Sequence, residues 1–401
     1  MKLATIRLGL IPALLSASLL YLSCTDKTAE KRVITVKNPL AIERSLETVE
    51  FDLGKFQMDN TDNLANTLGI VDVETKKEMT SQTVDTDGDG ILDILLFQPQ
   101  IGASAERSYE IVVTNTQPKQ EAVPLCYSRF VPERTDDYAW ENNRVAFRTY
   151  GPTAQKMVEN RVKGGTLSSG IDAWLKRVDY PIIDKWYKKE LETDGSYHED
   201  TGEGLDNFHV GPSRGVGGIA VKIDTSYYIS RNFVTWKTIT TGPLRTSFEL
   251  TYADWDAQGQ KISEKKRISL DYGSNLSKFE IHLKGTDTVS AGLTLHQKEG
   301  EIGTNPEEGW VSYWEPHEGS ELGTGIVVPK EKMLGYDHYV TDEKDKSNLF
   351  ANINLNKKSI AVYYAGFGWK KSGQFSTKES WEKYLSQFSE KVNNPLVVTV
   401  K

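Results

Sequence analysis

The sequence predicts an all-β protein with a few helices, in which a small N-terminal β-sandwich precedes a larger β region. Short apolar runs rich in β-branched residues recur along most of the chain and are separated by turn residues. Only two stretches show the spacing of an amphipathic helix. The 401 residues are 38% hydrophobic and 10% aromatic, which is typical of a folded protein and excludes a disordered or collagen-like chain.

Residues 1–23 are predicted to be a signal peptide, because Lys2 and Arg7 precede a short apolar run at 8–22. Ser23-Cys24 resembles the end of the lipobox of bacterial lipoproteins, in which the cysteine is lipidated. We therefore expect a lipid on Cys24, a tether over 24–31, and a location in the bacterial envelope, periplasmic or at the outer membrane. The membrane is contacted through this anchor only. The alternative is a plain signal peptide that is cleaved nearby.

The region 32–117 is predicted to form the N-terminal β-sandwich. Its short apolar runs lie at 33–36, 49–53, 69–73, 94–97 and 109–113. The polar stretch 114–124 contains two prolines and lacks periodicity, so we place the domain boundary there.

The region 125–401 is predicted to contain two extended sheets packed face to face. Strand patterns occur at 226–239, 246–252, 265–270, 276–284, 360–364 and 396–400. One helix is expected within 170–191, broken at Pro181. A second helix is expected after a capping box formed by Ser376 and Glu379, with its buried face formed by Trp381, Tyr384, Leu385 and Phe388.

The overall charge argues against nucleic-acid binding. The chain has 48 Lys and Arg residues against 56 Asp and Glu, a net charge of −8, and no basic block, so no nucleic acid is expected as a partner. No protein partner is inferred.

Cys126 is the one cysteine expected in the folded body and is interpreted as a buried small hydrophobe. The chain lacks a G-x-S-x-G elbow, a P-loop and an H-E-x-x-H motif.

An acidic loop at 85–93 is a candidate metal site. Asp85, Asp87, Asp89 and Asp93 alternate with other residues around a glycine turn, and hard cations prefer several such oxygens. The spacing matches the first half of an EF-hand loop, but Leu96 stands where the bidentate glutamate would be. Two interpretations remain open, a structural Ca²⁺ and a metal-free hairpin. No cofactor is expected for the chemistry itself.

The segment 127–218 combines aromatic, polar and glycine residues more densely than the rest of the chain. Aromatic rings beside Asn, Asp and Arg are typical of sugar binding, because a ring covers the apolar face of a sugar while polar groups bind its hydroxyls. His198 and His209 lie in a stretch rich in Gly and Asp that is predicted to be a loop. The alternative for Trp140, Trp174 and Trp186 is a place in the core.

The runs 129–152, 172–187 and 198–218 resemble a family of Bacteroidetes envelope lipoproteins catalogued as a domain of unknown function. The most specific part is 140–148, and the resemblance covers nearly all of the mature chain. It implies a large β-supersandwich of the galactose-mutarotase or polysaccharide-lyase kind over 125–401. It also implies an oligosaccharide dehydratase from a polysaccharide-utilisation locus. The implied reaction removes water from the non-reducing-end uronic acid of ulvan fragments and gives a 4,5-unsaturated uronate.

This reaction needs a base for the C5 proton, an acid for the C4 hydroxyl and a cation for the carboxylate. We expect His198 and His209 to be the base and the acid, in an order left open, with Tyr187 as a reserve acid. Arg214, together with Lys176 or Arg148, is expected to bind the carboxylate of the anionic oligosaccharide. Trp140 and Asn142 are expected to contact sugar.

Three other functions fit the same residues. A polysaccharide lyase uses the same chemistry but expels a glycosidic oxygen. A glycoside hydrolase would use two carboxylates, drawn from Glu141, Asp200, Glu203 and Asp206. A surface glycan-binding lipoprotein would bind without turnover.

Overall fold

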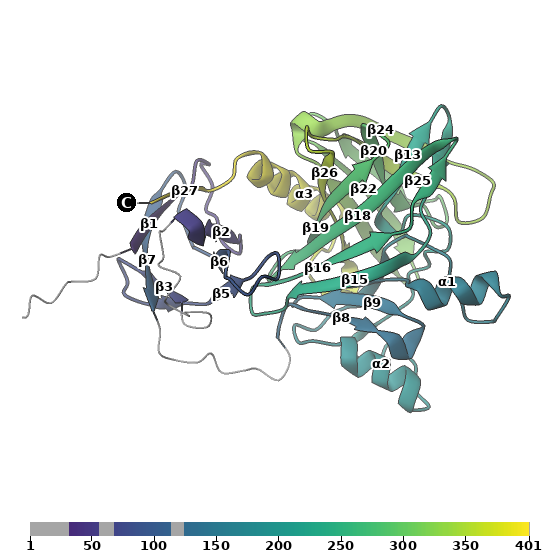
Figure 1. Ribbon diagram of the computed structural model, residues 1–401, viewed down its shortest axis with the longest axis horizontal. Coiled ribbons are helices and arrows are strands. Elements are labelled where there is room, and N and C mark those ends of the chain that lie inside the picture. The colour runs from purple at the N-terminus through teal and green to yellow at the C-terminus, as the bar shows by residue number, and fades with distance from the viewer. Residues whose placement is uncertain (1–31, 56–67, 114–123, 401) are drawn as a thin grey trace, which may run out of the picture. The chain divides into compact units, whose positions relative to one another are not determined.

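The computed structural model describes residues 32–55, 68–113 and 124–400 (Figure 1). Within these ranges the chain is mostly antiparallel β-structure with three α-helices, which confirms the predicted fold class. None of the helices described there is long and apolar enough to cross a membrane. The predicted signal peptide, Cys24, the tether and nearly all of the boundary segment 114–124 lie outside the described residues.

Two small sheets form the N-terminal sandwich. Five of the apolar residues that pack between them are Ile34, Phe51, Ile70, Phe97 and Ile111. One of the two sheets also contains the last strand of the described chain. The five-stranded sheet has the order β27 (Val397–Val400), β1 (Arg32–Lys37), β7 (Glu106–Val113), β3 (Leu68–Asp72) and β4 (Glu78–Met79). The three-stranded sheet has the order β2 (Val49–Asp52), β6 (Ile94–Phe97) and β5 (Ser81–Val84).

The last strand, β27, pairs with the first strand of the described chain. Ile34 is opposite Val400 and Lys37 is opposite Val397 in an antiparallel register. The sandwich predicted for 32–117 therefore takes one strand from residues 397–400. The pairing covers an edge of β1 that would otherwise present free backbone groups.

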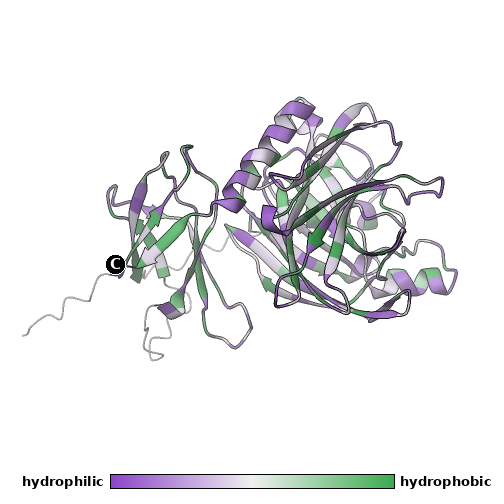
Figure 2. Ribbon diagram, turned by 90° about the horizontal axis from the view of Figure 1, so that it is seen from above, coloured by the Kyte–Doolittle hydropathy of each residue, from purple (hydrophilic) through white to green (hydrophobic). Residues whose placement is uncertain are grey.

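Two larger sheets enclose the main core. The nine-stranded sheet contains β15 (Phe233–Thr240), β16 (Arg245–Tyr252), β18 (Gln260–Asp271), β19 (Leu276–Lys284), β26 (Ile360–Trp369), β23 (Ser320–Val327), β22 (Trp310–His317) and β21 (Glu301–Asn305), with β17 (Trp255–Ala257) beside β18. The five-stranded sheet contains β14 (Ser226–Tyr228), β13 (Val216–Ile223), β20 (Thr288–Thr294), β25 (Asn348–Asn354) and β24 (Met333–Tyr339). Phe279 and Ile281 from one sheet and Val289 and Leu293 from the other lie in the same apolar cluster. Figure 2 shows hydrophobic residues concentrated on the strands, whereas the loops are largely hydrophilic.

A third sheet of the large region carries most of the predicted site segment. Its order is β12 (Gly204–Leu205), β11 (Asp172–Lys176), β10 (Ala146–Thr149), β9 (Asp137–Glu141) and β8 (Tyr127–Val131). Helix α1 (Pro152–Glu159) follows β10, and α2 (Ile183–Glu192) follows β11.

The prediction of helix over 170–191 is wrong for its first half, because residues 172–176 form β11. All five residues of β11 are buried. Trp174 packs into one apolar cluster, while Ala173 and Leu175 pack into another on the opposite face. A strand that is covered on both faces shows no alternation of apolar and polar residues, so its pattern cannot be told from that of a helix.

The C-terminal helix α3 (Lys378–Asn393) begins one residue later than predicted. The N-cap is Thr377, whose side chain accepts a hydrogen bond from the Ser380 backbone, and Ser380 accepts one from the Thr377 backbone in return. The capping box is therefore Thr377 with Ser380. Trp381 and Leu385 are buried, as the helical spacing predicts.

Gly215 allows two backbone segments to meet at the start of β13. Its φ is +61°, and a Cβ atom there would lie 1.8 Å from the carbonyl oxygen of Ile171, with which Gly215 forms a parallel bridge. Only glycine fits this approach. Gly215 thus serves the packing at the start of β13.

Candidate active site

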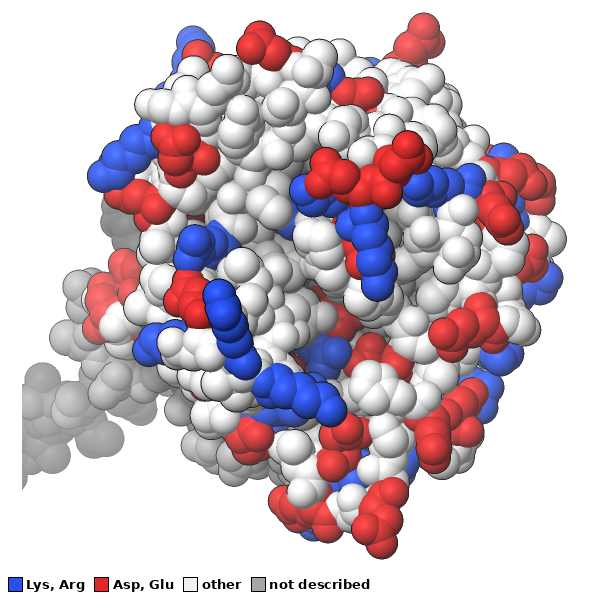
Figure 3. Space-filling view, turned by 90° about the vertical axis from the view of Figure 1, so that its right-hand side faces the viewer, with Lys and Arg blue, Asp and Glu red and all other residues white. Residues whose placement is uncertain are grey.

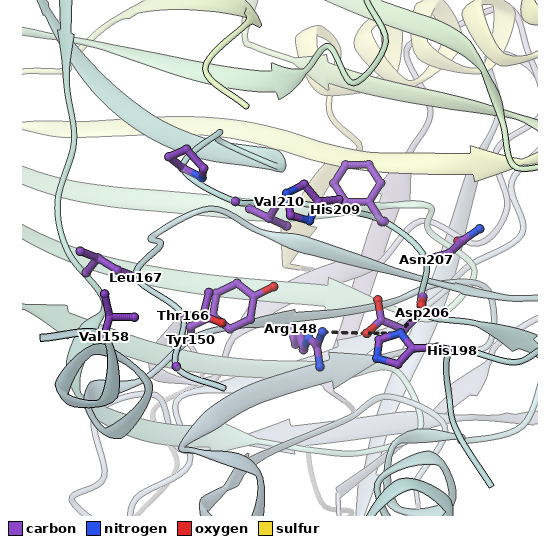
Figure 4. Close-up of a pocket in the computed structure, with 14 residues that line it drawn as sticks. Arg148, Tyr150, Val158, Thr166, Leu167, His198, Asp206, Asn207, His209 and Val210 are labelled. Carbon is purple, nitrogen blue, oxygen red and sulfur yellow. Dashed lines mark hydrogen bonds and ion pairs between the residues drawn. The ribbon is translucent and has the colours of Figure 1, made fainter. Parts of the chain in front are cut away.

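A cavity of about 580 Å³ opens beside β10 (Figure 4). Its size lies within the usual range for small-molecule pockets. Four parts of the chain supply its wall: the strand end at β10, the region of α1 up to residue 167, His198, and the loop 206–212. The lining residues are Arg148, Tyr150, Val158, Gly165, Thr166, Leu167, His198, Asp206, Asn207, Phe208, His209, Val210, Gly211 and Pro212.

Arg148 lies at the floor of this pocket and is held on several sides. Its Nε atom is 2.7 Å from Asp172 Oδ2 and its Nη2 atom is 2.7 Å from Asp206 Oδ2. Its Nη1 atom donates to the Tyr197 hydroxyl at 3.1 Å. The register of β10 against β11 places Arg148 directly opposite Asp172, so the sheet itself aligns this ion pair.

Tyr150 and His198 extend this arrangement to the two sides of the floor. The Tyr150 hydroxyl donates to Asp172 Oδ2 at 3.1 Å. His198 Nδ1 lies 2.6 Å from the backbone carbonyl oxygen of Asp206. Because a carbonyl only accepts, Nδ1 carries the proton, and the neutral ring offers Nε2 as a proton acceptor. We refer to Tyr150, Asp172, Arg148, Asp206 and His198 as the floor network.

Burial changes the protonation of the acidic groups around Arg148. Asp137 Oδ2, which accepts a hydrogen bond from Tyr187, lies 3.6 Å from Arg148. Burial raises the pKa of Asp137 to about 6, against the opposing effect of Arg148. Burial and the neighbouring Asp206 raise the pKa of Asp172 to about 8. Arg148 and Arg134 both act on Asp137, but burial and the neighbouring Asp206 outweigh the effect of Arg148 on Asp172, so the protonated form of Asp172 is favoured.

Burial also raises the pKa of the Tyr150 hydroxyl well above its ordinary value, with Asp172 adding to the effect. The phenol therefore keeps its proton in the resting site. Asp172 Oδ1 is buried without a hydrogen-bond partner. An unpaired oxygen in this position disfavours the charged carboxylate further.

His209 lies across the pocket from the floor, on the loop 206–212. Its Nε2 atom is 2.9 Å from Asp345 Oδ2, and its side chain is exposed. Figure 3 shows acidic and basic side chains intermixed on the face at the right of Figure 1, which is hollowed near its centre. An anionic ligand would therefore depend on individual donors such as Arg148 rather than on a basic surface.

The structure brings three of the predicted site residues together at the pocket: His198, His209 and Arg148. The other five are buried outside its lining. Arg214 donates to Ser169 Oγ and to the backbone of Ile219 and Pro212. Burial lowers the pKa of Arg214 to about 10. Arg214 is 1% exposed and does not line the pocket, so it is not placed to bind a substrate carboxylate there.

Lys176 and Asn142 support the fold around Glu141. Lys176 Nζ lies 2.7 Å from Glu141 Oε2, and both side chains are fully buried. Glu141 also accepts from the backbone of Ile182 and Ile183, where α2 begins. Asn142 donates to the backbone carbonyls of Asp271 and Ser274, 2.6 and 2.7 Å away. These groups join elements of the core and do not face the pocket.

Trp140 and Tyr187 are also core residues. Trp140 is 0% exposed, and its Nε1 atom donates to Ser277 Oγ at 3.0 Å. Trp174 and Trp186 are buried as well, so the alternative interpretation of these rings as core holds. Tyr187 donates to Asp137 at 3.0 Å and packs against Trp174.

Tyr150, Asp172 and Asp206 were not singled out by the sequence as a group. Asp172 and Tyr197 stand in runs whose aromatic and polar content does not distinguish them from their neighbours. The one available signal was an acidic residue, Asp172, at the start of an otherwise apolar run, since a carboxyl in such a run needs a partner.

A family model described as a domain of unknown function, DUF4861, matches residues 36–398. The chain belongs to this family. It is 57% identical over 388 residues to "Uncharacterized protein P7" of Formosa agariphila, covering 96% of this chain and 98% of that protein. The family predicted from the sequence, a domain of unknown function, is confirmed.

Solved structures similar to this DUF4861 protein include two from Enterococcus faecalis. A protein in the glycosyl hydrolase family 38 matches with a TM-score of 0.47 and 10% identity, over 92% of this chain and 47% of that chain. An alpha-mannosidase matches with a TM-score of 0.44 and 9% identity, over 92% of this chain and 46% of that chain. The DUF4861 chain thus spans about half the length of either protein.

The acidic loop of the DUF4861 protein brings three of its four carboxylates together. Oxygen atoms of Asp85, Asp87 and Asp89 lie within 4.8 Å of one another. Asp93 is not part of this group, because it accepts from the backbone and hydroxyl of Thr86. Asp85 accepts from the Gly88 and Gly90 amides, which lower the pKa of its carboxyl. Both a Ca²⁺ site and a metal-free hairpin fit this geometry, so the structural Ca²⁺ stays a prediction.

Proposed function

We propose that this DUF4861 protein is a dehydratase that removes water from the non-reducing-end uronic acid of ulvan-type oligosaccharides. The product is a 4,5-unsaturated uronate. One observation carries the proposal: the floor network holds a phenol and an imidazole, the acid and base types that a β-elimination needs, at one pocket. The resemblance of the chain to carbohydrate-active envelope lipoproteins supports the choice of substrate class.

His198 is the base in this proposal. The hydrogen bond from Nδ1 to the Asp206 carbonyl fixes the ring and leaves Nε2 for the C5 proton of the uronate. The side chain of His198 is 53% exposed, so a ligand can reach it.

Tyr150 is the acid. Its raised pKa keeps the proton on the phenol until the C4 hydroxyl departs. In the reaction the C5–H and C4–O bonds break and the C4=C5 bond forms. The phenol proton leaves with the hydroxyl as water, and the proton on His198 returns to Tyr150 through solvent. Asp172, which accepts from Tyr150, positions the phenol.

Arg148 is the group best placed to stabilise the charge that develops on the uronate carboxylate. Two of its donors are held by Asp172 and Asp206, so its position is fixed before substrate arrives. Removing such a preorganised donor typically costs about 3–4 kcal/mol of transition-state stabilisation. Thr166 and Asn207 line the same pocket and can bind sugar hydroxyls.

A glycoside hydrolase fits the pocket less well. Among the described residues that line it, Asp206 is the one carboxylate, and it is paired with Arg148. Glu141 is fully buried, while Asp200 and Glu203 pair with Arg177 and Lys185. Two carboxylates that flank a glycosidic bond, as hydrolysis requires, are not available at the pocket.

To test the proposal, the protein is incubated with saturated uronate-terminated oligosaccharides, and the ultraviolet absorbance and the mass of the sugars are followed. We expect a conjugated product that has lost one water and keeps its chain length. His198→Ala and Tyr150→Phe should each slow the reaction by about 10²–10⁴-fold. His282→Ala, an exposed histidine on β19, is the matched control and should leave the rate unchanged.

Each other outcome contradicts the proposal in a different way. Shorter unsaturated chains would indicate a lyase, and shorter saturated chains a hydrolase. Binding without any change in the sugar would indicate a glycan-binding protein. Full activity in both His198→Ala and Tyr150→Phe would overturn the assignment of the site.

A further inference from the structure

His296, Glu315 and His317 form a second group of titratable side chains, separate from the floor network. His296 follows the end of β20, while Glu315 and His317 are two residues apart on β22. Residues two apart on a strand point to the same face. One ligand atom from each of the three side chains lies within 4.8 Å of the others.

Two of these side chains are buried with atoms that have no partner. Glu315 is 2% exposed, and its Oε2 atom makes no hydrogen bond. His317 is 8% exposed, and its Nε2 atom makes none. A buried polar atom without a partner is costly, and two at one point are rare in native proteins. Something that accepts electron pairs from both would remove this cost.

The remaining imidazole nitrogens are tied to the backbone of the pocket loop. His296 Nε2 lies 3.0 Å from the carbonyl oxygen of His209, which fixes the proton on Nε2 and leaves Nδ1 toward Glu315. His317 is hydrogen-bonded to the backbone of Asn207. Histidines that bind metals typically donate their second nitrogen to a backbone carbonyl or a carboxylate in this way.

We propose that His296, Glu315 and His317 bind one divalent transition-metal ion, for which Zn²⁺ has the best-matched chemistry. The ligands are His296 Nδ1, the Glu315 carboxylate and His317 Nε2. Two imidazoles and one carboxylate suit Zn²⁺, whereas Ca²⁺ and Mg²⁺ prefer oxygen ligands throughout. Three protein ligands leave a fourth position for water.

The ion would join two sheets next to the pocket. His296 extends from the sheet that contains β20, and the other two ligands lie on β22 of the nine-stranded sheet. The Phe208 ring, which lines the pocket, packs edge-to-face on His296 with 4.5 Å between centroids. The metal therefore fixes the segment 207–209 of the pocket wall. The alternative is a metal-free ion pair between a protonated His296 and Glu315.

The test measures metal directly and does not depend on the proposed enzymatic activity. The full purified chain is stripped with a chelator and titrated with Zn²⁺ by calorimetry and with Co²⁺ by visible absorption. We expect one ion for each chain and the strong visible bands of four-coordinate Co²⁺. His317→Ala and Glu315→Gln should each weaken Zn²⁺ binding by more than about 100-fold, because even the outer partners of metal ligands are worth about 10–100-fold.

Two controls separate this site from others on the chain. His338→Ala changes an exposed histidine on β24 and should leave Zn²⁺ binding intact. Asp85→Asn with Asp89→Asn removes the acidic loop as a binding site and should also leave it intact.

The proposal is overturned if the wild-type chain binds no stoichiometric Zn²⁺ or Co²⁺. It is also overturned if both ligand variants bind Zn²⁺ as the wild type does. Circular dichroism reports whether the variants fold. Where they do not, the Co²⁺ spectrum of the wild-type chain decides, since octahedral Co²⁺ absorbs only weakly.

Discussion

Arg148 Nη2 lies 2.7 Å from Asp206 Oδ2, although the two residues are 58 positions apart in the chain. Asp172 holds the Nε atom of the same guanidinium at the same distance. All three side chains are nearly or fully buried. Arg148 is therefore both the cation that stabilises the buried carboxyl groups and the proposed donor to the substrate carboxylate.

Arg148→Met should lower the free energy of unfolding by about 3–5 kcal/mol, because it leaves buried carboxyl groups without their cation. Urea denaturation measures the change. Arg231→Met is the matched control, since Arg231 is exposed and pairs with Glu159 at the surface. Its cost should stay within about 1 kcal/mol. Equal losses in the two variants would contradict the role of Arg148 in the buried network.

Asp137→Asn should change how stability depends on pH. The pKa of Asp137 is raised to about 6 by burial, whereas an unfolded chain ionises its aspartates at their ordinary value of 3.8. The folded wild type therefore holds a proton that the unfolded chain has lost. Its stability falls as pH rises between these two values, by up to about 1.4 kcal/mol for each pH unit.

The asparagine in Asp137→Asn cannot ionise, so the variant should gain stability relative to the wild type as pH rises from 4 to 6. Above pH 6 the difference should level off. Urea titrations at several pH values measure this difference. If the variant instead loses stability relative to the wild type as pH rises from 4 to 6, the pKa of Asp137 is lowered and not raised.

Trp140→Phe tests whether this ring belongs to the core or contacts sugar. The substitution leaves the Ser277 hydroxyl without its donor and a gap where the indole was, so we expect a loss of about 1–3 kcal/mol in the free energy of unfolding. The KM for an oligosaccharide should not change, because Trp140 does not line the pocket. A higher KM with an unchanged free energy of unfolding would indicate that Trp140 contacts sugar.

Cys126 should resist alkylation in the native protein. Its thiol is fully buried, and burial raises its pKa well above the ordinary value, so little reactive thiolate forms. Iodoacetamide labelling followed by peptide mass spectrometry measures the modified fraction. Labelling in guanidinium chloride is the control and should go to completion. Fast labelling of the native thiol would indicate an accessible cysteine.

Much of the fold could be predicted from local patterns. The alternation in β19 and the helical face with Trp381 and Leu385 match the structure, because a half-buried element repeats its apolar residues with its own period. β11 was missed because both of its faces are covered. The pairing of β27 with β1 was missed because no local pattern specifies a partner so far away in the chain.

The site was predictable only in part. His198, His209 and Arg148 stand in a polar, glycine-rich segment, and the structure gathers them at one pocket. Nothing in the same segment separated Trp140 or Lys176 from these three. Residue type says what a side chain can do, whereas burial decides whether a ligand can reach it.

Local patterns in the chain predict the β class, the C-terminal helix and the segment in which the pocket is built, because these follow from periodicity and composition over neighbouring residues, whereas α1 was not predicted. Which polar residues meet depends on how the sheets pack. Arg148 with Asp206, and His296 with Glu315 and His317, come from different strands and loops. Hydrogen bonds and metal coordination act over about 2–3 Å, so their partners are set by how the sheets pack and not by spacing along the chain.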